Sequence, residues 1–167
     1  MCIRDSYRRG DRASEVLVRA WERMRLQLNN AWEERDIGLP LKSPYEVLIL
    51  ASIIEKESGM EGDRRKISGV FSRRLKRGMR LQTDPAVIYG LGQTFDGNLT
   101  RAHLMKDGPY NTYTRSGLPP TPISAAGLTA LHAATHPDAG SALFFVARGD
   151  GSSQYSDTLD ARLQAVR

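Results

Sequence analysis

Residues 43–58 read SPYEVLILASIIEKES and contain one of the two longest apolar runs of the chain. Ser43 can cap the start of a helix, Pro44 suits the first helical position, and Glu46 completes the pattern of a capping box. The run from Val47 to Ile54 is apolar on nearly every side of such a helix. These residues therefore predict the most buried helix of the domain.

Periodic patterns outside this segment predict further helices and one hairpin. Between Ala13 and about Glu34 apolar side chains recur every 3.6 residues, and we expect Trp21 and Trp32 on that face to anchor the core. Ser124 is the predicted N-cap of a later helix. Shorter helices are predicted at residues 63–76, 85–90, 100–105, 124–134 and 158–167, a β-hairpin from residues 142–147 and 153–156, and a long loop at residues 107–123.

Length and composition fit one compact globular domain of 167 residues, with 40% apolar and 26% charged residues. The net charge of +5, from 24 Lys and Arg against 19 Asp and Glu, would favour a polyanionic partner. A solvated, arginine-rich surface explains the same excess more simply, and the sequence contains none of the usual nucleic-acid-binding motifs. We therefore predict no nucleic-acid partner.

The N-terminal residues 1–10 show neither a signal-peptide pattern nor helical periodicity, so we expect them to be unstructured or artefactual. Cys2 is the only cysteine, which excludes a disulfide within the chain and disfavours a cysteine-based metal site. No run of about 18 apolar residues occurs, so these 167 residues predict no membrane span.

Glu55 and Glu57 come at the C-terminal end of the predicted buried helix. The helix dipole disfavours a negative charge there by roughly 0.3–1 kcal/mol, and Glu57, next to the core, is also expected to be partly desolvated. Both effects raise the pKa of a carboxyl group. A carboxyl group still protonated near neutral pH is what a glycosidase needs as a general acid. The alternative is a solvated helix end formed by Glu55, Lys56 and Glu57.

Two non-periodic segments are rich in hydrogen-bonding side chains. One contains Gln82, Thr83 and Asp84, and the other contains Asn111 and Tyr113. Amides, hydroxyls and tyrosine rings are common in sugar-binding sites. Ordinary helix-cap and turn chemistry is the alternative explanation for the same residues.

Other catalytic chemistries find little support in the sequence. His103, His132 and His136 do not follow a metal-ligand pattern, although the last two are four residues apart near a helix end. There is no GxSxG nucleophile motif and no glycine-rich phosphate-binding motif. We therefore expect neither a metal nor a cofactor.

Five motifs occur in the order and with the spacing of one known family. They are residues 50–58 (LASIIEKES), 70–75 (VFSRRL), 78–90 (GMRLQTDPAVIYG), 110–114 (YNTYT) and 117–124 (GLPPTPIS). Across about residues 13–167 the sequence closely resembles the endolytic murein transglycosylase family (MltG, YceG-like). The resemblance implies an α+β fold, a mainly helical lysozyme-like catalytic domain with a small β-hairpin, over residues 11–167.

The resemblance also implies an activity and its residues. The essential glutamate of the family falls on Glu57 rather than Glu55. The family reaction cleaves the β-1,4 bond between N-acetylmuramic acid and N-acetylglucosamine without water, within peptidoglycan strands, and leaves a 1,6-anhydro end. The residues implied to line the glycan cleft are Gln82, Thr83, Asp84, Asn111 and Tyr113. Because Asp84 supplies a second carboxylate, a hydrolytic muramidase is an alternative, and so is a non-catalytic glycan-binding scaffold for cell-wall synthases.

The sequence departs from the family pattern near its C-terminal end. The family usually has a histidine near Ser153 and a Glu-His pair near Ala161 and Arg162, and all three positions differ here. We therefore expect no site role for this segment. The family also carries a membrane anchor and a LysM-like region before the catalytic domain, which these residues do not contain. The resemblance implies a full-length protein anchored in the inner membrane with its catalytic domain outside it, acting on peptidoglycan strands in cell-wall biogenesis, with synthases as candidate partners.

Overall fold

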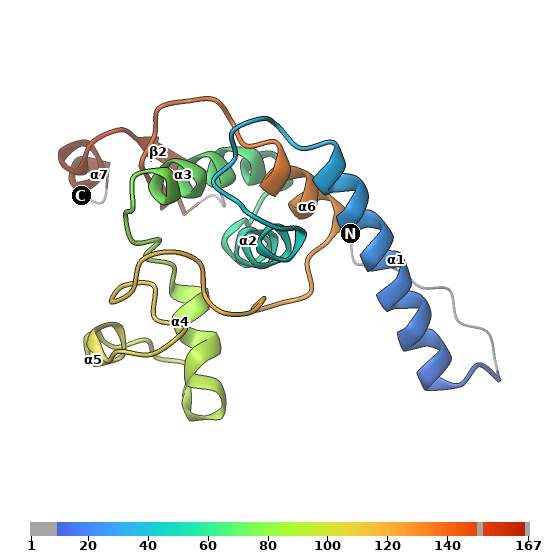
Figure 1. Cartoon of the computed structure of the whole chain (residues 1–167). Helices are drawn as coiled ribbons and strands as arrows, with labels where there is room; N and C mark the ends of the chain where they lie inside the picture. Colours follow the sequence, from blue (N-terminus) through green and yellow to red (C-terminus); the bar gives the residue numbers. More distant parts are fainter. Residues whose placement is uncertain (1–9, 150–151, 166–167) are drawn as a thin grey trace.

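A computed structural model describes residues 10–149 and 152–165 of the chain, so the predicted N-terminal segment 1–10 lies almost wholly outside the described residues. Helix α2 (Pro44–Glu57) lies at the centre, and Figure 1 views it nearly along its axis. Helices α1, α3, α4 and α6 pack against it. The predicted buried helix is therefore the core of the fold.

The sequence around α2 explains both its start and its burial. Ser43 Oγ accepts a hydrogen bond from the Glu46 amide at 3.3 Å, and Pro44 takes the first helical position. The predicted capping box is wrong in its second half, because Glu46 Oε2 accepts from the amide of Lys42 at 2.6 Å rather than from Ser43. Seven side chains of α2 are buried, namely Val47, Ile49, Leu50, Ala51, Ser52, Ile53 and Ile54.

The remaining helices follow the predicted ranges closely. One boundary was predicted wrongly: α6 begins at Leu128, with Gly127 as its N-cap, because the Ser124 hydroxyl donates instead to the carbonyl of Ser52 at 2.9 Å. That bond joins the preceding loop to α2. The elements are α1 (Ala13–Glu33), η1 (Glu61–Asp63), α3 (Arg64–Lys76), α4 (Asp84–Leu91), η2 (Gly92–Thr94), α5 (Arg101–Met105), α6 (Leu128–Thr135) and α7 (Leu159–Ala165).

Only half of helix α1 packs against the rest of the described residues. Its C-terminal half packs on the core through Met24, Leu28, Ala31 and Trp32, whereas its N-terminal half extends away from the other helices (Figure 1). Trp21 is 63% exposed, so the prediction that it anchors the core is wrong, while Trp32 does pack there. Neither α1 nor another helix in residues 10–149 and 152–165 is long and apolar enough to cross a bilayer.

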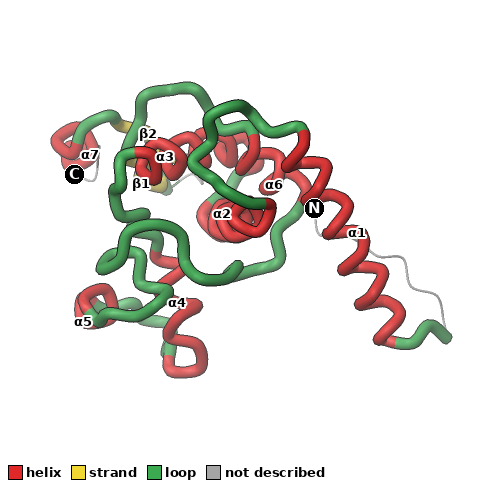
Figure 2. Tube along the Cα trace, in the orientation of Figure 1, coloured by secondary structure: helices red, strands yellow, loops and turns green. Residues whose placement is uncertain are grey.

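The predicted hairpin forms and is attached to α3. Strands β1 (Phe144–Ala147) and β2 (Ser153–Ser156) pair antiparallel with Phe144 opposite Ser156, and they lie behind α3 in Figure 2. The ring of Phe145 meets that of Phe71 on α3 edge to face at 5.7 Å. A helical core with one small antiparallel sheet confirms the α+β class.

Candidate active site

The carboxyl-bearing end of α2 opens on a polar cavity. Glu57, the last residue of α2, is half-buried and lines a cavity of about 260 Å³. Gln82 from the segment before α4, Asp84 at the start of α4 and Tyr113 from the long loop line the same cavity. Four of the six residues predicted for the site are therefore brought together around one space.

The surroundings of Glu57 favour its protonated form. Burial raises the pKa of this carboxyl above its ordinary value of 4.5, and the negative charge of Asp84 raises it further. The hydroxyl of Thr83 acts in the opposite direction and lowers the pKa of Glu57. Burial is the largest of the three effects, so the carboxyl holds its proton to a higher pH than an exposed glutamate does.

Glu55, two residues earlier, is engaged in structural contacts. Its Oε1 pairs with the guanidinium of Arg64 at 2.9 Å, and its Oε2 accepts from the amide of Gly127 at 3.0 Å. Arg64 in turn donates to Ser58 at 3.1 Å and to the hydroxyl of Thr129. Glu55 thus ties the end of α2 to α3 and α6, and it does not line the cavity.

A short segment between α3 and α4 brings Gln82 to the cavity, with Thr83 next to it. The Gln82 amide donates to the carbonyl of Thr112 at 3.1 Å, and the Thr83 amide donates to the Thr112 hydroxyl at 2.9 Å. Gln82 has φ of +52°, a left-handed conformation that is uncommon for a residue other than glycine. These two bonds hold the backbone there, and the Gln82 side chain remains exposed at the cavity. Such strained positions cluster at functional sites.

Thr83 is buried between this segment and Glu57. Its hydroxyl forms no hydrogen bond of regular geometry with the described residues, and its effect on the pKa of Glu57 identifies that carboxyl as its neighbour. Thr83 is also the N-cap residue of α4, although its side chain does not cap the helix. Thr83 is therefore a cap residue by position only, and it does not itself line the cavity at Glu57.

Asp84 and Tyr113 form a hydrogen-bonded pair in the cavity wall. The Tyr113 hydroxyl donates to Asp84 Oδ1 at 2.5 Å. Burial, this bond and the negative charges of Asp84 and Glu57 raise the pKa of Tyr113. The phenol therefore stays protonated and continues to donate to Asp84.

Asn111 has a different position from the one predicted, because it does not line the cavity at Glu57. It is buried, and its Nδ2 donates to the carbonyls of His103, Leu104 and Lys106 at 3.1, 3.1 and 2.7 Å. Its Oδ1 accepts from the amide of Tyr113 at 2.9 Å. Asn111 thus shapes the loop that carries Tyr113.

The C-terminal segment contributes to the cavity, contrary to expectation. Arg162 of α7 and residues 145–147 of β1 line it together with Glu57. Arg74 of α3 lines it as well, and it is buried with Nε donating to the carbonyl of Leu143 at 2.7 Å. Arg74 is four residues after Val70 and so lies on the apolar face of α3. A charged residue on an apolar helix face is a pattern from which a role at the site could have been predicted. Arg162 lies in a short exposed helix that offers no such signal.

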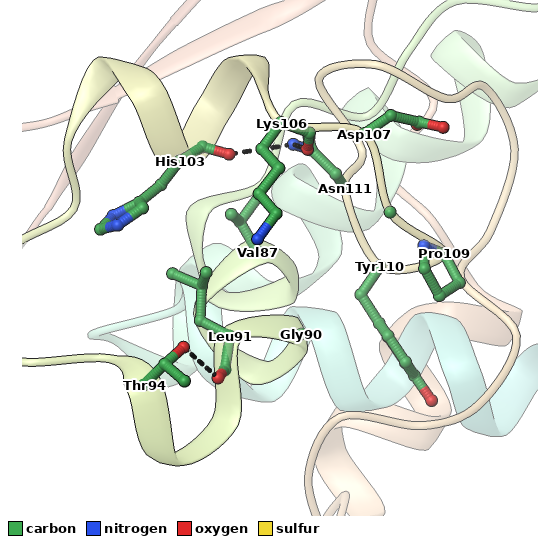
Figure 3. A pocket seen from close by; sticks show the side chains of 11 residues that line it. Val87, Gly90, Leu91, Thr94, His103, Lys106, Asp107, Pro109, Tyr110 and Asn111 are labelled. Carbon is green, nitrogen blue, oxygen red and sulfur yellow. Dashed lines mark hydrogen bonds between the residues drawn. The ribbon is translucent and has the colours of Figure 1, made fainter.

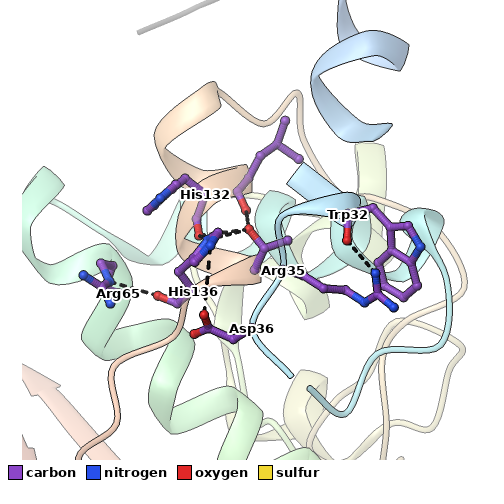
Figure 4. Close-up of polar contacts among 8 residues, drawn as sticks. Trp32, Arg35, Asp36, Arg65, His132 and His136 are labelled. Atoms are coloured by element: carbon purple, nitrogen blue, oxygen red, sulfur yellow. Dashed lines mark hydrogen bonds and ion pairs between the residues drawn. The ribbon is translucent and has the colours of Figure 1, made fainter. Parts of the chain in front are cut away.

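The histidines lie outside this cavity. His132 and His136 stack with ring centroids 4.3 Å apart, and His136 Nε2 is 4.0 Å from Asp36 Oδ1 (Figure 4). Burial and then the charge of His136 lower the pKa of His132. Within the part of the chain that the structure describes, no three His, Cys, Asp or Glu side chains are arranged to hold a metal ion.

Comparisons with known proteins place the chain in a family. The model of the YceG-like family matches residues 5–167. An endolytic murein transglycosylase of Bacillus subtilis is 44% identical over 117 residues, covering 70% of this chain and 32% of the relative. One of Streptococcus pneumoniae is 36% identical over 107 residues, covering 61% of this chain and 19% of the relative.

A solved structure extends the match to the fold. The crystal structure of a YceG-like protein from Listeria monocytogenes superposes with a TM-score of 0.75 at 35% identity, covering 91% of this chain and 48% of that one. The chain spans about a third or less of the length of the curated relatives that it matches. With nearly every residue matched by the family model, the chain belongs to the YceG-like family.

Proposed function

We propose that this chain carries the catalytic site of an endolytic lytic transglycosylase, which cleaves the β-1,4 bond between N-acetylmuramic acid and N-acetylglucosamine within peptidoglycan strands. The observation that carries the proposal is the half-buried Glu57 carboxyl, with its raised pKa, at the wall of a polar cavity. The names of the Bacillus and Streptococcus relatives support the same activity.

One carboxyl group suffices for the reaction. Protonated Glu57 donates its proton to the glycosidic oxygen as the C1–O bond breaks and C1 develops oxocarbenium character. The resulting carboxylate then takes the proton of the muramic C6 hydroxyl while that oxygen bonds to C1. The products are a free hydroxyl on one fragment and a 1,6-anhydro end on the other, and Glu57 is again protonated. Because the nucleophile belongs to the substrate, positioning replaces an activated water.

The neighbouring groups take supporting roles in this proposal. The negative charge of Asp84 adds to the effect of burial in raising the Glu57 pKa, and it would stabilise the developing positive charge at C1. The Tyr113 hydroxyl holds Asp84 in place. Gln82, whose amide stands exposed at the cavity, is suited to bind sugar hydroxyls or an N-acetyl group, and Thr83 orients the Glu57 carboxyl. Asn111 acts through the loop rather than on substrate.

A hydrolytic muramidase is the second candidate, because Asp84 supplies a second carboxylate in the same cavity. In that reaction one carboxyl protonates the leaving oxygen, and the other activates a water or attacks C1. The product would then be a reducing end.

Mass spectrometry of peptidoglycan fragments after digestion distinguishes the candidates. We expect fragments with 1,6-anhydro ends from the wild-type chain and none from a Glu57→Gln variant. Reducing ends would favour the muramidase. Anhydro fragments from Glu57→Gln would remove Glu57 from the mechanism, and a lack of cleavage by either form would favour a glycan-binding scaffold.

The cellular setting belongs to the same proposal. Murein lies outside the cytoplasmic membrane, so the catalytic residues would act in the cell envelope. For the whole protein we propose attachment to the inner membrane through an anchor outside these residues. We also propose that it contacts cell-wall synthases.

A further inference from the structure

A second cavity, larger than the one at Glu57, lies further along α4, toward the C-terminal end of that helix. It has a volume of about 400 Å³ and is enclosed by α4, α5 and the start of the long loop (Figure 3). Val87, Leu91, Pro109 and Tyr110 supply apolar walls. Cavities of several hundred Å³ with apolar walls and a few polar groups are typical of ligand sites.

The walls of this cavity are held in place by specific contacts. The Tyr110 hydroxyl is 2.7 Å from Thr121 Oγ1, and its ring meets that of Tyr89 edge to face at 5.0 Å. A Cβ on Gly90 would come within 2.8 Å of Tyr110 Cβ, so glycine is what allows the loop to approach α4. Asn111 fixes the other wall through the carbonyls that it binds. The cavity is therefore formed before a ligand arrives.

The charged groups at this cavity leave a positive centre. Figure 3 shows the Lys106 side chain reaching toward the space between Leu91 and Tyr110. Asp107 points the other way and is bound by Arg115 through two bonds of 2.9 and 2.7 Å. No ion pair of Lys106 occurs within the described residues. An apolar cavity with one ammonium group at its side suits a carboxylate that carries small apolar substituents.

The two cavities share α4 and the long loop. Asp84 lines the first, and Leu91 lines the second from the other end of the helix. At a rise of about 1.5 Å per residue these positions are about 10 Å apart along α4. An extended peptide spans that distance with about three residues. Val87, which lines the second cavity, is one helical turn from Asp84, so the two cavities are neighbours along α4 on the scale of a short peptide.

We propose that the second cavity binds the peptide stem of the murein strand whose glycan occupies the Glu57 cavity, with Lys106 pairing with a stem carboxylate. This inference rests on the proposed function. Each muramic acid of murein bears a short peptide with alanine methyl groups and free carboxylates, and these match the apolar walls and the single cation. The pairing favours strands that retain their stems over strands from which they have been removed.

An NMR titration of the 167-residue chain with a muramyl tripeptide measures binding directly. It therefore tests the inference without relying on cleavage. We expect Lys106→Gln to weaken binding about tenfold, as for loss of a charged hydrogen bond. Lys42→Gln, at an exposed lysine outside both cavities, should leave binding unchanged. The same tripeptide with amidated carboxylates should bind the wild type as weakly as the acid form binds Lys106→Gln.

A cleavage assay completes the test. On stem-bearing strands Lys106→Gln should lower kcat/KM about tenfold, and on strands stripped of peptide by an amidase it should match the wild type. Equal binding of the acid and amidated tripeptides, or equal loss of rate on both kinds of strand, would overturn the proposal. If no strand is cleaved by the wild type, the proposed function fails, and the titration alone decides whether the cavity binds the stem.

Discussion

The two sides of the last turn of α2 carry the same functional group in opposite circumstances. On one side Glu55 meets a guanidinium, a backbone amide and the start of α6. On the other side Glu57 meets a buried hydroxyl, the charge of Asp84 and an open cavity. Two carboxyl groups separated by one residue thus differ entirely in their partners.

The difference shows what separates a structural carboxylate from a catalytic one. An ion pair and an amide donor engage both oxygens of a carboxylate and hold it in place. Burial beside a like charge destabilises the charged form and leaves the proton available for transfer. On this account Glu55 holds the helices together, and Glu57 performs acid and base chemistry.

Replacing Glu57 should give the largest effect. Glu57→Gln removes the transferable proton and keeps the shape of the side chain, so kcat should fall by about 10²–10⁴. Chromatography of released glycan fragments measures the loss, and circular dichroism checks that the helical fold is kept. A variant with more than a tenth of the wild-type rate would contradict the assigned role.

Replacing Glu55 should affect stability instead. Glu55→Gln loses the ion pair with Arg64 and weakens the bond from Gly127, which should lower the free energy of unfolding by about 1–2 kcal/mol. Urea denaturation measures this change. The cleavage rate of the folded variant should stay within about threefold of wild type, and a collapse of activity without loss of stability would reverse the roles of the two residues.

Removing the Tyr113 hydroxyl should have an intermediate effect on rate. Tyr113→Phe deprives Asp84 of its donor, which leaves more of its negative charge facing Glu57. We expect kcat to fall about tenfold. The pH at which activity declines on the alkaline side should also move upward, because a stronger negative neighbour raises the pKa of Glu57 further. A pH–rate profile tests both, and a downward move would refute the coupling.

The smallest effect should be the dependence of stability on pH. The pKa of Glu57 is raised in the folded chain above its ordinary value of 4.5. Its contribution to stability is therefore complete below about pH 4.5 and is lost as the pH rises through the raised value. Thermal unfolding should show that the stability of Glu57→Gln relative to wild type increases from pH 4 to pH 8. A relative stability that stays constant or decreases would mean that burial does not penalise the carboxylate.

The sequence predicted the core well, because local signals and burial agreed there. Ser43, Pro44 and the apolar run after them specify α2 almost to the residue. Trp21 and Ser124 were assigned wrongly for one reason, since periodicity and capping preferences do not show which partner a side chain meets. Trp21 stays 63% exposed, with the Arg25 guanidinium over its ring, and Ser124 binds the carbonyl of Ser52 across the fold.

The candidate site was predictable only in part. The end of the buried helix stood out because a charge is unfavourable there, and the family resemblance then selected Glu57 over Glu55. Sequence segments rich in polar groups also indicated Gln82, Asp84 and Tyr113. Asn111 binds backbone carbonyls of its own loop, and Arg162 lines the Glu57 cavity. Both positions depend on how the loop and α7 pack, which no local pattern specifies.

The most direct measurement is a titration of the glutamate side-chain carboxyls by ¹³C NMR, with the Glu57 resonance identified by its absence from Glu57→Gln. We predict that this carboxyl titrates above pH 4.5 and that its midpoint coincides with the alkaline loss of cleavage activity. A midpoint at or below 4.5 would contradict a proton donor held neutral by its buried position at the end of α2.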